Sequence, residues 1–404
     1  MCIETYWLVI VYARLIRIGT SGWSYKDWEG VFYKPGENKL QRYCKIFNTV
    51  EIDSTFYSYP DMKIVEKISQ NTPRNFVFTA KIPSLITHEK KLDVSKGVLK
   101  DLHRFLELVK PLENAGKLGP LLIQLPPSFE YSKHKDFLET FLSQLPERYR
   151  FSIEFRDNSW IREDVMNMLS RYSVAYTIVD EPLLPPELHI TTDFTYIRWH
   201  GRGRNPWYYY HYSREELSEW KPKITKMLEE TREVYGYFNN HFKGYAVHNA
   251  LQVLEILEVI TPSQRKALEE VEKNLKKNVF EQPKLSIIIP PEKIPENVED
   301  MLKLLTDEAR FKRGKEIGRR EIEILEKSPS SLSAKIKEYN VFIDVERKII
   351  FHDCADWVKV KNTLSFCKHL VALMLQLEPD YSKKILREII LERASWTFTD
   401  YSYE

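Results

Sequence analysis

The feature that most constrains the fold is an alternation of short apolar runs with longer amphipathic stretches over the first 260 residues. The runs are rich in β-branched and aromatic residues, which is typical of strands buried on both faces of a parallel sheet. Eight such runs occur, at residues 15–21, 49–55, 76–81, 121–125, 151–156, 175–180, 194–200 and 234–240.

Amphipathic stretches typical of helices lie between most of these runs, at residues 40–47, 62–70, 98–109, 133–145, 162–172 and 214–230. Strand and helix in strict alternation predict a parallel sheet. Eight units in about 250 residues match the size of a closed barrel. We therefore predict an α/β fold, a TIM-like (β/α)8 barrel. An open doubly wound sheet is the alternative, although no Gly-rich phosphate-binding motif follows the first run.

Three segments are expected along the chain. The barrel covers residues 1–260 and a charged helical linker covers residues 261–325, which are rich in Lys and Glu. A basic run in the linker has the usual explanation of a solvated helix face. Its members are Arg310, Lys312, Arg313, Lys315, Arg319 and Arg320. Residues 326–404 contain two short predicted strands, a Cys/His cluster and an apolar helix, and we predict a small zinc-binding module there.

The cluster consists of two pairs of ligand-type residues, each with one residue between its members. His352 and Cys354 form the first pair, and Cys367 and His369 form the second. Alternate side chains of an extended segment share one face, so both members of a pair can reach one ion. Structural Zn²⁺ sites use four such ligands in a tetrahedron. The alternative is two buried cysteines and two histidines that are close by chance.

This segment resembles the SWIM zinc finger, in which a Cys-x-Cys pair is followed by a Cys-x-His pair. The neighbouring sequences Ala-Asp-Trp at 355–357 and Cys-Lys-His-Leu-Val-Ala-Leu at 367–373 agree, as does Phe-Lys-Arg-Gly-Lys at 311–315. His352 stands where the family usually has Cys, and imidazole can replace thiolate on zinc. The resemblance implies a module that binds DNA or a protein partner and is not catalytic.

Polar residues end every predicted strand of the barrel. In such barrels the C-terminal strand ends and the loops after them build the active site. A charge within a strand is costly to bury without a partner, so charged residues there need an explanation. We take seven as candidate catalytic residues: Glu51, Asp53, Glu154, Arg156, Asp180, Arg198 and His200. The alternative is a ring of internal ion pairs that only stabilises the barrel.

Aromatic, basic and amide side chains in the same loops provide candidate substrate contacts. They are Trp23, Tyr25, Tyr57, Lys81, His88, Gln124, Trp160, Arg202, Arg204, Asn239 and Asn240. Cations interleaved with exposed rings suit an anionic ligand that can stack, and single-stranded nucleic acid is such a ligand. A sugar phosphate or a nucleotide fits the same set.

Seven motifs in this region together resemble the YecE-like family, the domain of unknown function 72. They are GTSGW at 19–23, VEIDSTFY at 50–57, ITH at 86–88, QLPP at 124–127, IEFR at 153–156, RWHG at 198–201 and FNN at 238–240. The resemblance covers residues 16–258 and implies the barrel fold, but it supplies no reaction. Asp53 stands where the family usually has Asn, which adds an acid to the barrel mouth.

Three kinds of chemistry are compatible with these residues. Glu51, Asp53, His88, Glu154, Asp180 and His200 provide enough ligands for one or two Mg²⁺ or Mn²⁺ ions, and two-metal sites cleave phosphodiesters. Metal-free catalysis would use His200 and Glu154 as base and acid, with Arg198 holding an anion. The third possibility is a binding platform without catalysis.

We therefore hypothesise a nucleic-acid-processing protein, in its most concrete form a metal-dependent nuclease acting on single strands. The zinc module and the basic run would hold the strand. The alternatives are a small-molecule isomerase, lyase or hydrolase acting on a phosphorylated or sugar-like substrate, and a non-catalytic scaffold that binds nucleic acid or protein.

Composition adds limits on location. The net charge is only +2 and there are four Cys in 404 residues, which fits a reducing cytoplasm and no disulfide framework. The apolar run at 6–13 is too short to span a bilayer. We expect a cytoplasmic protein with no membrane partner, and the sequence indicates no particular oligomeric state.

Overall fold

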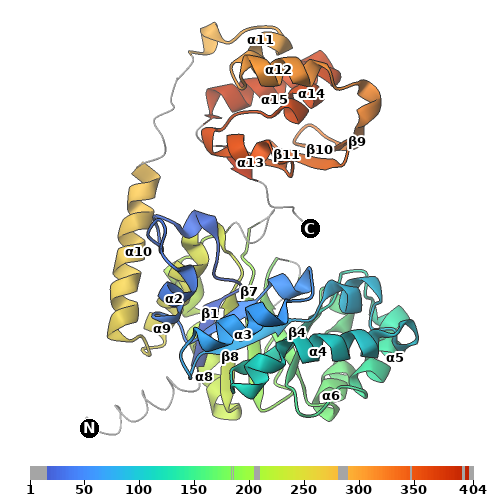
Figure 1. Ribbon diagram of the computed structural model, residues 1–404, viewed down its shortest axis with the longest axis vertical. Helices are drawn as coiled ribbons and strands as arrows, with labels where there is room; N and C mark the ends of the chain where they lie inside the picture. Colours follow the sequence, from blue (N-terminus) through green and yellow to red (C-terminus); the bar gives the residue numbers. More distant parts are fainter. Residues whose placement is uncertain are drawn as a thin grey trace. The chain divides into compact units, whose positions relative to one another are not determined.

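The computed structural model describes residues 16–182, 184, 186–203, 210–280, 290–345, 348–393 and 396–399. The chain forms two compact units, Met1–Asn278 and Val279–Glu404, and each has its own hydrophobic core (Figure 1). The apolar run at 6–13 and Arg204 lie outside the described residues.

The first unit is the predicted β/α barrel. Its strands are β1 (Ile16–Thr20), β2 (Thr49–Ile52), β3 (Val77–Lys81), β4 (Leu118–Gln124), β5 (Phe151–Glu154), β6 (Val174–Asp180), β7 (Phe194–Trp199) and β8 (Glu233–Phe238). They pair in parallel in the order β1-β8-β7-β6-β5-β4-β3-β2. Each strand contains one of the eight predicted runs or most of it. Because the first strand, β1, pairs with the last, β8, the prediction of a barrel rather than an open sheet is confirmed.

The barrel is nearly closed, and the remaining seam lies between β1 and β2. There the backbone forms an isolated bridge between Ser21 and Glu51, and the Gly22 amide donates to the Glu51 carbonyl at 2.8 Å. The bridge therefore lies at the same end of the barrel as the candidate catalytic residues.

Helices surround the strands (Figure 1). They are α2 (Lys39–Cys44), α3 (Met62–Gln70), α4 (Val98–Asn114), α5 (Tyr131–Leu142), α6 (Glu163–Arg171), α7 (Arg214–Ser218), α8 (Trp220–Glu230), α9 (Tyr245–Ile256) and α10 (Pro262–Phe280). Several begin at capping residues: Asp61 accepts from the Lys63 amide, and Ser213 forms a capping box with Glu216.

Alternating side chains of each strand divide between two layers. The inner layer at mid-barrel is a cluster of Val77, Leu122, Ala175, Phe194, Tyr196, Tyr235 and Tyr237. The outer side chains pack under the helices in a second and larger cluster. Because both layers are buried, the barrel strands show no apolar–polar alternation in sequence.

The second unit is an α+β module. Its sheet has the order β13-β12-β11-β10-β9, built from β9 (Ile322–Lys327), β10 (Ser331–Ile336), β11 (Tyr339–Asp344), β12 (Ile349–His352) and β13 (Thr397–Thr399). Its helices are α11 (Val298–Lys303), α12 (Glu308–Lys315), α13 (Trp357–Val360), α14 (Lys368–Gln376) and α15 (Pro379–Leu391). The two strands predicted here correspond to β11 and β12.

The predicted linker 261–325 divides between the two units. Helix α10 is fixed to the barrel: the Gln264 side chain donates to the Ile46 carbonyl at 2.8 Å and Asn274 donates to the Val31 carbonyl at 3.0 Å. Helices α11 and α12 instead contribute Met301 and Phe311 to the core of the second unit. These apolar residues were obscured in sequence by the surrounding Lys and Glu.

Gly314 allows α12 to lie directly against α14. A Cβ atom at this position would be 2.6 Å from Val371 Cγ1 and 2.9 Å from the Lys368 carbonyl oxygen. Both neighbours are on the helix that carries His369, so this close approach fixes part of the Cys/His cluster.

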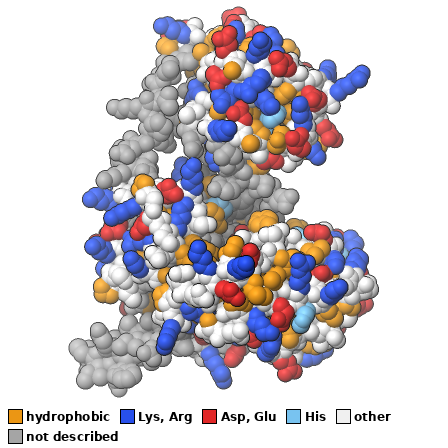
Figure 2. Space-filling view, in the orientation of Figure 1, with side chains coloured by type: hydrophobic (Ala, Val, Ile, Leu, Met, Phe, Trp, Pro, Cys, Tyr) orange, Lys and Arg blue, Asp and Glu red, His pale blue; other side chains and the backbone are white. Residues whose placement is uncertain are grey.

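Charges of both signs are intermingled on the face shown in Figure 2, as the small net charge suggests. None of the helices formed by the described residues is both long enough and apolar enough to span a bilayer.

Candidate functional site

The floor of the barrel mouth is a buried ion-pair network centred on Arg198 of β7. Its Nη2 lies 2.8 Å from Glu51 Oε1, and its Nη1 lies 2.8 Å from Glu154 Oε2. The Ser21 hydroxyl donates to Glu51 Oε1 at 2.6 Å and the Tyr196 hydroxyl donates to Oε2 at 2.7 Å. The three charged side chains are fully buried, so this part of the mouth resembles the ion-pair ring that we gave as the alternative.

Arg156 joins this floor to a second acid. Its Nε donates to Glu154 Oε1 at 2.6 Å and its Nη1 donates to Glu181 Oε2 at 2.5 Å. Burial opposes ionisation of Glu154, but Arg156 and Arg198 outweigh it and hold the pKa of that carboxyl well below its usual range. Glu154 is therefore a fixed anion with its oxygens occupied, and it is a poor general acid.

His200 is also engaged by the two arginines. Its Nε2 accepts from Arg156 Nη2 at 3.0 Å and from Arg198 Nη1 at 3.3 Å, and its Nδ1 lies 3.1 Å from the side-chain amide nitrogen of Asn239. Burial and the Arg156 charge lower the pKa of His200 to about 3. The ring is neutral, and its basic nitrogen is not available to a substrate, so the metal-free pairing of His200 as base with Glu154 as acid does not fit this geometry.

Glu181, which follows β6 directly, has the opposite character. Its side chain is only 1% exposed, and one oxygen contacts Arg156. The other oxygen, Oε1, is buried without a hydrogen-bond partner among the described residues. Burial raises the pKa of this carboxyl to about 7, although Arg156 opposes the shift. A group with this pKa can exchange protons near neutral pH.

Sequence reasoning missed Glu181 and chose Asp180 instead. Thr177 bonds Ser152 inside the barrel at 2.5 Å, so residues two and four positions beyond Thr177 share the inner side. Asp180 faces the helix layer, where it accepts from Trp220 Nε1 at 3.0 Å and from Arg202 at 2.9 Å. Because strand side chains alternate, Glu181 could have been assigned to the inner side from Thr177. That assignment requires knowing that Thr177 and its partner Ser152 point inward.

Three further predicted contacts lie away from the mouth. Arg202 is bound to Asp180 and to Glu219 at the start of α8. Asn240 faces outward and donates to Asn249 of α9 at 2.8 Å. Trp160 is fully buried and stacks on Phe155 at 4.9 Å. These side chains are polar or aromatic because they hold the helix layer against the strands.

The remaining predicted residues lie around the mouth, and all of them except the buried Lys81 are partly accessible. Lys81 contacts Asp53 Oδ1 at 2.6 Å and lies 5.0 Å from the centre of the Phe56 ring. His88 packs edge-on against Phe56, and burial with the Lys81 charge lowers its pKa to about 4. Tyr57 is 74% exposed. Trp23, Tyr25, Gln124 and Asn239 are half-buried.

Two buried polar atoms of the mouth have neither a hydrogen-bond nor an ion-pair partner among the described residues. They are Glu181 Oε1 and Gln124 Oε1. Gln124 and Glu154 are paired across β4 and β5, so one such atom lies on each side of β5. Since buried polar atoms are normally bonded, these two are the places where a ligand would supply hydrogen bonds.

The charges of the mouth nearly cancel. Lys81, Arg156 and Arg198 face the carboxylates of Asp53, Glu51 and Glu154, and each cation contacts at least one of them. With Glu181 protonated, the mouth has no net charge. The excess of positive charge that a phosphodiester would need is absent from the described residues of the mouth.

The second unit contains the predicted cluster of His352, Cys354, Cys367 and His369. The four side chains are buried, and their ligand atoms all lie within 4.8 Å of one another. Ligands at about 2.0–2.3 Å from a tetrahedral Zn²⁺ lie roughly 3.3–3.8 Å apart, so a small contraction would complete such a site. Elsewhere in the described residues no group of three or more His, Cys, Asp or Glu is arranged to hold a metal ion.

The surroundings of the cluster orient its ligands. His352 Nδ1 donates to the Asn340 carbonyl at 2.7 Å, which directs Nε2 into the site, and the Trp357 amide donates to Cys354 Sγ at 3.2 Å. Outer hydrogen bonds of this kind fix the tautomer of metal-bound histidine and stabilise thiolate. Strand β12 supplies His352, and Cys367 and His369 lie at the N-terminus of α14.

The fold and the mouth together define a β/α barrel protein with a sealed ion-pair floor and one acid of near-neutral pKa. The chain belongs to the family described as protein of unknown function DUF72, whose model matches residues 17–272. This confirms the resemblance drawn from the motifs.

Curated proteins and solved structures that are similar to this chain support its membership of the family. The chain is 27% identical to the UPF0759 protein YunF of Bacillus subtilis over 274 residues, which are 61% of this chain and 95% of that protein. It is 30% identical to YecE of Escherichia coli K12 over 142 residues, 35% of this chain and 48% of that protein. A crystal structure of a DUF72 protein from Thermotoga maritima has 33% identity and a TM-score of 0.55, and covers 60% of this chain and 99% of that one.

Proposed function

We propose that the barrel mouth is a metal-independent proton-transfer site for a small, uncharged, hydroxyl-bearing substrate such as a sugar. The observation that carries this proposal is Glu181, a buried carboxyl with one oxygen on Arg156 and the other without a partner among the described residues. With its pKa raised to about 7 by burial, it can donate or accept a proton near neutral pH.

The substrate class follows from charge and hydrogen bonding. The neutral mouth gives no electrostatic preference to a phosphate, which argues against the single-strand nuclease as the function of the barrel. The side-chain oxygens of Gln124 and Glu181 that bond to none of the described residues would accept hydrogen bonds from substrate hydroxyls. Exposed Tyr57 at the rim offers a ring face of the kind that packs on the apolar side of a sugar.

Deuterium exchange tests this proposal. The intact protein is incubated in D₂O with a panel of aldoses and ketoses, with and without added Mg²⁺ or Mn²⁺. Proton NMR then measures the loss of signal from the hydrogen on the carbon beside the carbonyl. We expect deuterium incorporation that needs no added metal, disappears in Glu181→Gln, and is retained in Glu147→Gln, a control at an exposed position.

The same preparations are incubated with labelled single-stranded DNA and RNA. No exchange into any sugar of the panel, or exchange that is unchanged by Glu181→Gln, would refute the proton-transfer proposal. Oligonucleotide cleavage that requires added Mn²⁺ or Mg²⁺ would favour the nuclease in its place.

We propose nucleic-acid binding for the second unit as a second function. Four of the six residues in its basic run form no ion pair with a carboxylate of the described residues: Lys312, Arg313, Arg319 and Arg320 are exposed, whereas Arg310 contacts Asp307 and Asp356, and Lys315 contacts Glu299. The resemblance of its Cys/His cluster to a SWIM finger supports a binding role of this kind.

Salt dependence tests the second function. We expect the affinity of the intact chain for a labelled single strand to fall steeply with ionic strength, and each phosphate that the protein neutralises should contribute about 0.7 to the log–log slope. The double substitution Lys312→Gln with Arg313→Gln should make the slope shallower, whereas Lys45→Gln on the barrel should not. An affinity that ignores ionic strength would exclude the nucleic-acid role and favour a protein partner.

A further inference from the structure

A pocket lies outside the barrel mouth, between the segment after β1 and helix α10. It has a volume of about 410 Å³, at the low end of the roughly 300–1,000 Å³ typical of small-ligand sites. Its lining contains none of the mouth residues. The lining residues are Gly30, Val31, Phe32, Tyr33, Lys34, Pro35, Glu37, Arg42, Glu270, Val271, Lys273 and Asn274.

The base of the pocket is apolar and rigid. Val31, Phe32 and Val271 are at most 5% exposed, so their packing is fixed by the core of the barrel unit. The Asn274 side chain ties α10 to the Val31 carbonyl at 3.0 Å. A ligand with a short hydrocarbon chain could bury that chain on this surface without rearranging it.

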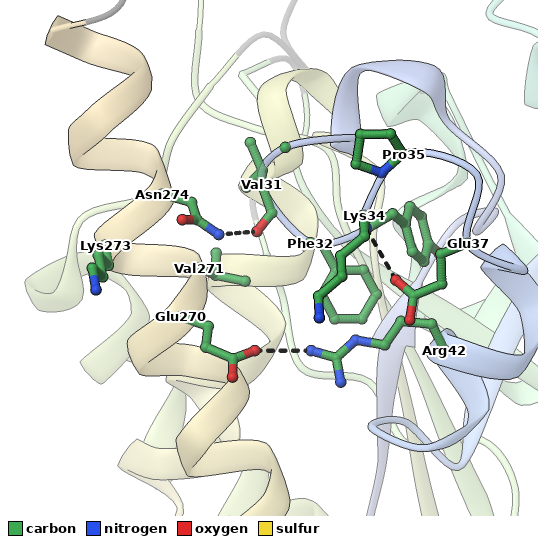
Figure 3. Close-up of a pocket in the computed structure, with 12 residues that line it drawn as sticks. Val31, Phe32, Lys34, Pro35, Glu37, Arg42, Glu270, Val271, Lys273 and Asn274 are labelled. Carbon is green, nitrogen blue, oxygen red and sulfur yellow. Dashed lines mark hydrogen bonds and ion pairs between the residues drawn. The ribbon is translucent and has the colours of Figure 1, made fainter.

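The polar side of the pocket contains an ammonium group that pairs with no carboxylate of the described residues. Arg42 and Glu270 face each other at 3.1 Å (Figure 3). Glu37 accepts from the Lys34 backbone amide at 3.0 Å. Both acids are therefore engaged, while the Lys34 side chain extends from its loop toward Arg42 and Glu270 (Figure 3) and makes no ion pair within the described part of the chain.

The lining contains three cations and two carboxylates. Of these cations, Lys273 extends away from the other labelled side chains (Figure 3). Lys34 and the remaining N–H groups of Arg42 are thus the donors for a ligand. Arg42 is held by its contact with the Phe32 ring, 5.3 Å from the ring centre, so its guanidinium is already oriented.

We propose that this pocket binds a carboxylate with a short apolar chain, its charge on Lys34 and Arg42 and its chain on Phe32 and Val271. A singly charged ligand matches the single Lys34 ammonium, which pairs with no carboxylate of the described residues, better than a doubly charged phosphate does. Because the bound molecule would contact both the segment after β1 and α10, it would stabilise the docking of α10 on the barrel. This inference is independent of the chemistry of the mouth.

The test uses hexanoate as the probe, with the intact chain at constant ionic strength. Binding is measured by calorimetry, and hydrogen exchange is followed in peptides covering residues 265–275. We expect saturable binding with a Kd of about 1 mM, reasonable for a ligand of about eight heavy atoms, together with slower exchange in α10. Acetate, hexan-1-ol and inorganic phosphate, each lacking one of the features required, should bind at least fivefold more weakly.

Three variants locate the site. Lys34 is exposed, so its substitution should not disturb folding. Lys34→Gln should weaken hexanoate binding at least fivefold, Lys34→Arg should retain it, and Lys45→Gln, which removes an exposed charge outside the lining, should leave it unchanged. Equal binding of hexanoate to Lys34→Gln and the unsubstituted chain, equal binding of hexan-1-ol, or no saturable binding of hexanoate would each overturn the proposal.

Discussion

Replacing Glu181 by Gln should change how the stability of the barrel depends on pH. The pKa of this carboxyl is raised from 4.5 to about 7 in the folded chain. A raised pKa means that the folded state binds the proton more tightly than the unfolded state. The resulting stability is fully present below pH 4.5 and is lost as the pH rises through about 7.

The magnitude follows from the size of the shift. At about 1.4 kcal/mol per unit of pKa, a displacement of this size corresponds to about 3 kcal/mol between the two ends of the window. Glu181→Gln removes the titration and keeps an oxygen that can accept from Arg156. Relative to the unsubstituted chain, the variant should therefore gain about 3 kcal/mol between about pH 4.5 and pH 8.

The measurement is hydrogen exchange in increasing urea at several pH values, read from peptides covering β5 and β6 so that the second unit does not contribute. Glu147→Gln, at an exposed site outside the barrel mouth, controls for the loss of a carboxylate. Parallel pH profiles for Glu181→Gln and the unsubstituted chain would refute the reasoning, because the buried acid would then titrate as it does in water.

Three further outcomes are expected. Arg198→Met should destabilise the barrel by about 3–5 kcal/mol, because it leaves Glu51 and Glu154 buried without this cation; adding Glu51→Gln and Glu154→Gln should restore much of that stability in urea denaturation. Gly314→Ala should cost about 1–3 kcal/mol in the second unit, since its Cβ would lie 2.6 Å from Val371, and hydrogen exchange in α14 would detect it. Elemental analysis should find one zinc per chain and none in Cys367→Ser; a metal-free native chain would contradict the site.

The barrel could be predicted from the sequence because the same pattern, an apolar run followed by a helical stretch, recurs along the chain. Eight apolar runs separated by helical patterns leave few other topologies. The Cys/His cluster was also predictable, since each ligand pair is local and its spacing is visible without folding. In both cases the chemistry of neighbouring residues was sufficient.

The details of the mouth could be predicted from the sequence less well, for a physical reason. Barrel strands are buried on both faces, so nothing in their composition tells which of two adjacent acids points inward, and Asp180 was preferred to Glu181. The same ambiguity made Trp160 and Asn240 look like substrate contacts. In the second unit, β9 was hidden because it is an exposed edge strand rich in Glu and Lys.

The pairing of β1 with β8 has a consequence for how the chain can fold. Ile16 lies opposite Val234, so the first strand finds its hydrogen-bonding partner roughly 220 residues later. On the other side, within the described part of the chain, its backbone pairing is limited to the bridge at Ser21 and Glu51. During synthesis, the N-terminal strand therefore stays without a full partner until almost the whole barrel has been made. Its aggregation-prone edge is exposed for that time, and closure should be among the last steps of folding.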